Sequence, residues 1–130
     1  MAYFCAVKIP TLMPPTATTK CLTMSTCRLQ KNKLSYWFLP QNDNARYTSM
    51  DIEFTDGTTL RQAGFNGLTD QNGVNMHPAY GRGIVGQWNY IESNTGSKCA
   101  GKVIRKIMYS YDQPGSTGQY RGYVDDIRIW

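Results

Sequence analysis

The sequence predicts an all-β fold, an antiparallel β-sandwich of roughly six to nine short strands. Short apolar or alternating stretches recur along the chain, and Gly, Pro, Asn and Asp turn residues separate them. The chain has 130 residues, which indicates one domain, 1–130, large enough to bury a core without help from disulfides. We therefore expect a single sandwich domain, with residues 1–32 as its least typical portion.

The N-terminal third carries the weakest pattern. Residues 1–9 predict a strand that Pro10 ends. Residues 11–19 contain paired prolines, which exclude a central strand, so we expect a loop there. Residues 20–29 are rich in β-forming residues but show no clear alternation.

The pattern becomes clearer after residue 33. The continuous apolar run LSYWFL at 34–39 is typical of a strand buried on both faces. Residues 49–54 alternate apolar and acidic side chains, and Asp56-Gly57 then predicts a hairpin turn with a returning strand. The glycine-rich stretch 61–83 predicts a long loop, and loops of that length are often functional.

The C-terminal half predicts three further strands. Residues 84–93 form one, with Gly86, Trp88 and Tyr90 on a shared face. Residues 102–111 also fit a helical stripe, but their β-branched and aromatic content favours a strand. Residues 118–130 predict a turn followed by one long terminal strand.

The terminal strand contains an anomaly at Asp125-Asp126. Tyr120, Gly122 and Val124 face one way, and the two adjacent carboxylates then interrupt the alternation before Ile127 resumes it. Such a pair must either aim one carboxylate inward or break the pleat with a bulge. A buried carboxylate needs a cation or dense hydrogen bonding.

Charge and cysteine content narrow the functional classes. The net charge is +5, and the excess lies before Gln41, where there is no acidic residue. These basic residues are not interleaved with aromatic ones, so nucleic-acid binding is not expected. No apolar run is long enough to span a membrane, and the opening residues lack the features of a signal peptide. The cysteines have no zinc-ligand spacing, and either disulfides or free thiols are compatible with their positions, which are Cys5, Cys21, Cys27 and Cys99.

An enzymatic function is not expected. The only histidine is His77, before Pro78, which is typical of a loop residue, and no GxSxG motif surrounds a serine. There is no P-loop or GxGxxG motif. Asp51 and Glu53 share a strand face, but their alternation with core residues indicates an exposed polar side instead of a glycosidase pair.

A family resemblance is visible from residue 33 to 129. The blocks that carry it are KLSYWFLP, DIEFTDGTTLR, DQNGVNMHP, RGIVGQWNYI, AGKVIRKIMYSYD and GQYRGYVDDIRI. Together they resemble an accessory domain of large secreted bacterial glycoside hydrolases, including α-mannosidases. That domain looks like a galactose-binding-like jelly roll, and residues 1–32 do not share the resemblance.

The resemblance implies sugar binding without catalysis, often with a structural calcium. It places Asp125, with Asp126 beside it, at the calcium position, and Ca²⁺ takes about six to eight oxygen ligands. The competing interpretation is an ion pair of either aspartate with an arginine, namely Arg105, Arg121 or Arg128. The DQNG sequence at 70–73 looks like part of a calcium loop but is more typical of a turn.

A sugar site needs aromatic faces and planar polar groups. Tyr80 and Arg82 in the glycine-rich loop are the first choice, and Tyr120 with Arg121 beside the last turn are the second. Trp88 is also a candidate, although its shared face with Tyr90 favours the core. The remaining residues considered are Trp37, expected in the core, and Gln87 and Asn89, which either line a groove or are merely exposed.

The expected function is a non-catalytic carbohydrate-binding module. By resemblance it would bind glycan outside the cell, beside a glycoside hydrolase domain that it targets to substrate. The alternative is a structural sandwich that packs against a neighbouring domain and binds no sugar. Clustered exposed aromatic residues with a polar rim would favour the first, and a flat apolar patch the second.

Overall fold

A computed structural model describes residues 5–7, 20–28, 33–63, 67–113, 115 and 118–130. The strands are β1 (Cys5–Val7), β2 (Lys20–Arg28), β3 (Leu34–Pro40), β4 (Thr48–Phe54), β5 (Asn89–Ser93), β6 (Val103–Tyr111) and β7 (Gly122–Ile129). The helices are short: η1 (Asp43–Arg46), α1 (Leu60–Ala63) and α2 (Gly96–Cys99). None of the helices in these ranges has the length and apolar character that a membrane crossing requires.

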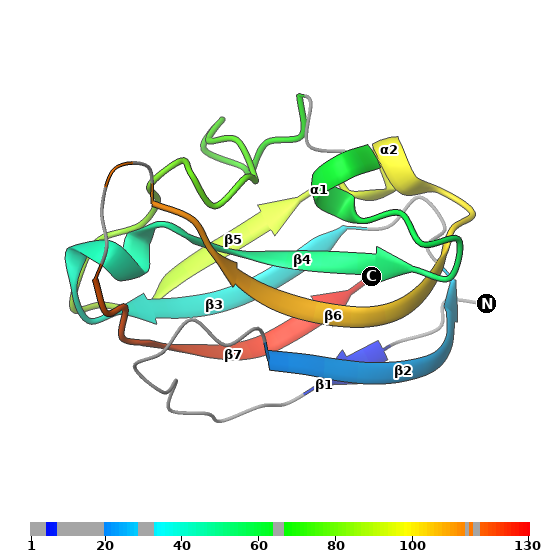
Figure 1. Cartoon of the computed structure of the whole chain (residues 1–130), viewed down its shortest axis with the longest axis horizontal. Coiled ribbons are helices and arrows are strands. Elements are labelled where there is room, and N and C mark those ends of the chain that lie inside the picture. The colour runs from blue at the N-terminus through cyan, green and yellow to red at the C-terminus, as the bar shows by residue number, and fades with distance from the viewer. Residues whose placement is uncertain (1–4, 8–19, 29–32, 64–66, 114, 116–117) are drawn as a thin grey trace.

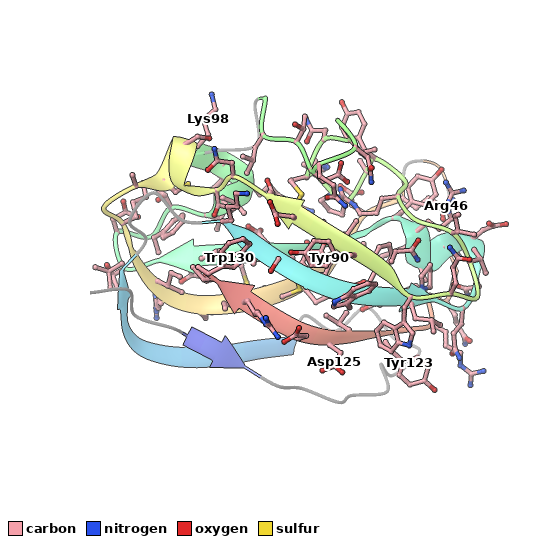
Figure 2. All side chains as sticks on the ribbon, turned by 180° about the vertical axis from the view of Figure 1, so that it is seen from behind. Arg46, Tyr90, Lys98, Tyr123, Asp125 and Trp130 are labelled. Carbon is pink, nitrogen blue, oxygen red and sulfur yellow. The ribbon has the colours of Figure 1, made fainter. Side chains whose placement is uncertain are left out.

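The strands form two antiparallel sheets that share one core. The four-stranded sheet has the order β1-β7-β3-β5, and the three-stranded sheet has the order β2-β6-β4. The smaller sheet lies in front in Figure 1, and the reversed view of Figure 2 turns the larger sheet toward the viewer. Alternate residues of β3 and β4 meet in the core, which contains Tyr36 and Phe38 from β3 and Ile52 and Phe54 from β4. The prediction of an all-β fold is confirmed, with a sandwich-like arrangement of the sheets.

Several element predictions are confirmed and others need correction. Residues 49–54 lie in β4 and residues 103–111 in β6, close to the expected ranges, and the described residues 67–83 are loop and turns with isolated bridges. The turn at Asp56-Gly57 forms, but only one bridge, Glu53 to Thr59, follows it before α1 begins. The expected loop at 11–19 lies outside the described residues.

Two exposure predictions and one strand boundary were wrong. Asp51, expected on an exposed polar side, is buried, and its Oδ1 accepts from the N–H groups of Ile52 and Arg61. Strand β3 is not buried on both faces, because Trp37 is exposed between the buried Tyr36 and Phe38. The strand expected at 84–93 begins only at Asn89. The Asn89 side chain instead holds the preceding turn, where it accepts from the Ile84 N–H and donates to the Ile84 and Gln87 carbonyls.

The choice between a disulfide and a free thiol is settled for one of the four cysteines. Cys99 at the end of α2 is a free, buried thiol, and burial raises its pKa. The side chains of the other cysteines lie outside the described part of the chain.

The aspartate pair in β7 forms a bulge, one of the two solutions expected. Ser35 pairs with Arg128 and Trp37 pairs with Asp125, so β7 holds one more residue than β3 over this interval. Asp126 adopts a left-handed conformation, with φ of 51°. Without this bulge the residues after it would exchange faces of the sheet, because strand side chains alternate.

Candidate aromatic binding face

The outer surface of the four-stranded sheet carries most of the exposed tryptophan and tyrosine side chains in the described chain. Leu34, Tyr36 and Phe38 point into the core, so the intervening residues of β3 point outward. Figure 2 shows that Tyr90, Tyr123 and Trp130 lie along this surface, with Asp125 among them. We call this group the aromatic face and define it by Trp37, Trp88, Tyr90, Tyr123 and Trp130.

The pairing register places these side chains on three neighbouring strands. Trp37 lies at the centre, opposite Tyr90 on β5 and Asp125 on β7. Tyr123 is opposite Leu39, and Trp130 pairs through its backbone with Lys33 at the other end of β3. Trp88 precedes β5 and has the same strand parity as Tyr90.

Polar residues separate the aromatic ones. Ser35 on β3 is flanked by Glu92 on β5 and Arg128 on β7. This row lies between the row of Trp37 and the end that carries Trp130. The face is therefore a mixed surface of rings and polar groups, not a uniform apolar patch.

The aromatic rings are substantially exposed. The exposed fraction is 39% for Trp37, 45% for Trp88, 36% for Tyr90 and 48% for Trp130. The rings of Trp37 and Tyr90 also touch, with centroids 5.2 Å apart and planes tilted by 50°. Large apolar groups gathered on one face of a soluble domain commonly mark an interaction site.

Hydrogen bonds fix the orientation of these exposed rings. The Tyr90 hydroxyl donates to Glu92 Oε2 at 3.0 Å, and Lys33 Nζ donates to Glu92 Oε1 at 2.6 Å. Lys33 also lies 5.2 Å from the centroid of the Trp130 ring, whose Nε1 donates to Ser35 Oγ at 3.1 Å. The hydrogen bond from Lys33 lowers the pKa of Glu92, so this carboxylate remains ionised near neutral pH. The rings are thus held in place before any ligand arrives.

The loop 67–88 supports the edge of the face. The Gln71 side chain donates to the Tyr90 carbonyl at 2.6 Å and accepts from the Glu92 N–H at 2.8 Å. These are the bonds that a neighbouring strand would make, so Gln71 closes part of the open edge of β5. The expected turn at 70–73 is present, since Asp70 Oδ1 accepts from the N–H groups of Asn72 and Val74.

Arg82 lies inside the molecule, and the prediction that it presents its guanidinium to a sugar was wrong. Its Nη2 donates to the carbonyls of Asn75, at 2.6 Å, and His77, at 3.3 Å. Its Nη1 lies 3.6 Å from Asp70 Oδ2, and both side chains are almost fully buried. Arg82 therefore holds the loop together from below, because a buried charge needs such partners.

The other predicted sugar-binding residues divide between surface and interior. Tyr80 is exposed in the loop, and Trp88 is exposed beside β5, not in the core. Tyr120 is buried and stacks on Tyr111, with centroids 4.7 Å apart, so its ring is not available to a ligand. Arg121 is exposed, two residues before Tyr123.

The bulge contains an ion pair and a local backbone hydrogen bond. Arg128 Nε donates to Asp126 Oδ1 at 2.7 Å, and the Asp126 N–H donates to Asp125 Oδ1 at 2.8 Å. Of the alternatives for this pair, the arginine contact is the one present. No group of three or more acidic, histidine or cysteine side chains in the described ranges is arranged to hold a metal ion. Calcium at Asp125 and Asp126 stays a prediction.

Sequence reasoning missed the aromatic face mainly at Trp37. The stretch 34–39, with five apolar residues and one serine, looks buried on both sides, yet the Trp37 ring faces solvent. The available clue was parity: Trp88 and Tyr90 share a face, and an aromatic stripe there could as well have been external. The registers that align Trp37 with Tyr90, and Leu39 with Tyr123, come only from the fold.

In comparisons with known proteins, no family model matches this chain and no curated protein matches it.

Proposed function

We propose that this chain is a non-catalytic carbohydrate-binding module that binds glycan on the aromatic face. The observation that carries the proposal is the hydrogen-bond network of Lys33, Glu92 and Tyr90, which orients exposed rings that a monomer does not need to expose. Sugar rings have apolar C–H faces that stack on aromatic rings and hydroxyl groups that bond to polar neighbours. The face offers both kinds of group side by side.

The polar residues favour a sugar over a packed protein domain. Glu92, Asp125 and Arg128 interrupt the rings at positions that an obligate protein interface would fill with apolar side chains. The alternative function is a structural spacer whose aromatic face packs against a neighbouring domain. That alternative predicts no glycan binding at all.

Substitutions at Trp37 and Tyr80 decide between the face and the loop. We expect Trp37→Ala to weaken binding of soluble glycans by at least about tenfold, equal to about 1.4 kcal/mol. Tyr80→Ala is the matched control, because Tyr80 is even more exposed than Trp37 but lies outside the aromatic face. Calorimetric titration with a panel of glycans measures both. Loss of binding in the Tyr80 variant alone would show that the glycan site lies in the loop and not on the aromatic face. If the unmodified protein bound no glycan, the result would favour the structural spacer.

The resemblance supports further proposals about the whole protein. The two sheets would belong to a galactose-binding-like jelly roll, and the domain would act outside the cell beside a glycoside hydrolase. A structural calcium remains part of this picture only if oxygen ligands beyond Asp125 and Asp126 complete the site. Thermal unfolding with Ca²⁺ and with a chelator tests it, since a ligand that binds only the folded state raises the midpoint. Equal midpoints would exclude calcium.

A further inference from the structure

We infer that the aromatic face binds an extended, neutral glycan chain lying along β3, instead of a single terminal sugar. This inference rests on the proposed function and adds the size and charge of the ligand. It follows from three features of the face: its length, the spacing of its rings, and the pairing of its charges.

The face is longer than one sugar ring. Tyr123 is opposite Leu39 at one end of β3, and Trp130 is paired with Lys33 at the other. Six residue steps separate Lys33 from Leu39, and strands rise about 3.3 Å per residue, so the two ends lie roughly 20 Å apart. A monosaccharide can contact only part of this length, whereas a chain of several sugars can contact both ends.

The rings are spaced along this direction with polar groups between them. Tyr123 and Trp88 lie at one end, Trp37 and Tyr90 in the middle, and Trp130 at the far end. Glu92 and Arg128 supply the polar groups between the middle rings and Trp130, while Ser35 between them is buried and accepts from the Trp130 indole. A chain lying on the face would thus meet stacking positions and hydrogen-bonding positions in turn, which suits repeated sugar units.

The charges on the face are largely paired with one another. Lys33 contacts Glu92 at 2.6 Å, and Arg128 contacts Asp126 at 2.7 Å. Asp125 accepts a backbone hydrogen bond beside Trp37, and Arg121 is exposed near the Tyr123 end. The face therefore has no cluster of unpaired cations that would select an acidic or sulfated glycan.

A length series tests this inference separately from the proposed function. Calorimetry would compare disaccharides to hexasaccharides of neutral glucose- and mannose-based chains, with a uronic acid chain as the charged counterpart. We expect the hexasaccharide of the preferred series to bind at least about tenfold more tightly than its disaccharide, and more tightly than the uronic acid chain.

Variants at the two ends complete the test. Trp130→Ala and Tyr123→Ala should each weaken hexasaccharide binding and reduce the affinity ratio between hexasaccharide and disaccharide. Tyr80→Ala, outside the aromatic face, is the control that should leave both affinities unchanged, and thermal unfolding checks that each variant is folded. Equal affinity for short and long chains, or preference for the uronic acid chain, would overturn the inference and leave the proposed function standing. Absence of binding to every glycan would overturn both.

Discussion

The left-handed conformation of Asp126 predicts that glycine is more stabilising than valine at position 126, whereas the reverse order is expected at the neighbouring position 125. A side chain with φ near +51° is strained unless it is Gly, Asn or Asp, and a β-branched residue is the least suitable. We expect Asp126→Val to lose about 2 kcal/mol relative to an unstrained backbone. Asp126→Gly adopts this conformation without strain, but it costs about 0.5–1 kcal/mol of stability because glycine loses more conformational entropy on folding. Both variants lose the Arg128 ion pair, which therefore cancels in the comparison.

The glycine variant should consequently be more stable than the valine variant by about 1 kcal/mol. For a domain of this size that difference corresponds to about 4 °C in the unfolding midpoint. The matched control is Asp125, which pairs regularly with Trp37. There valine suits a strand and glycine weakens it, so Asp125→Val should be the more stable variant. Thermal unfolding followed by circular dichroism measures all four. The same order of valine and glycine at both positions would refute the assignment of the bulge.

Two predictions concern titratable groups near the loop. Burial raises the pKa of Asp51 more than the hydrogen bonds from the Arg61 and Ile52 N–H groups lower it. The pKa of Asp51 is therefore higher in the folded state than in the unfolded state. As the pH rises from the unfolded pKa to the folded pKa, ionisation of Asp51 lowers the stability of the fold. Asp51→Asn keeps the acceptor oxygen and should raise the unfolding midpoint at pH 7 but not at acidic pH; a lower midpoint at pH 7 would show that attraction to Arg61 and His77 outweighs burial. Asp56→Asn is the opposite control, because hydrogen bonds from Lys102 and Thr58 lower the pKa of Asp56. Burial and the charge of Arg61 lower the pKa of His77, so stability should fall as pH drops below about 6.5, where the unfolded histidine takes up its proton first. The NMR titration of this single histidine measures its pKa directly, and a value above 6.5 would contradict the prediction.

Local patterns predicted the strands well where alternation was strict. Residues 49–54 and the terminal strand have one face of core residues each, so period-two spacing located both. The bulge was also predictable, because adjacent carboxylates between apolar neighbours leave few alternatives. The hairpin after Asp56-Gly57 was not, since the chain turns into α1 to bury Leu60 in the core.

The candidate site was harder to predict because it depends on long-range register. Tyr80 and Arg82 are close in sequence and look equivalent in a glycine-rich loop, yet one is exposed and the other is buried against Asp70. Nothing local distinguishes them, because Asp70 is twelve residues away from Arg82 and the loop must close for the pair to form. Trp37, Tyr90 and Trp130 likewise meet only when β3, β5 and β7 align.

The bulge in β7 determines which side chains of this strand lie on the aromatic face. Tyr123 and Asp125 have odd numbers and face outward, whereas Arg128 and Trp130 have even numbers and also face outward. A regular strand cannot place both pairs on one side, since its side chains alternate strictly. The extra residue at Asp126 changes the parity once, which keeps Val124, Ile127 and Ile129 in the core and gives the face rings at both ends. The left-handed residue at Asp126 is thus connected to the length of the aromatic face, because without the bulge either Tyr123 or Trp130 would leave the face.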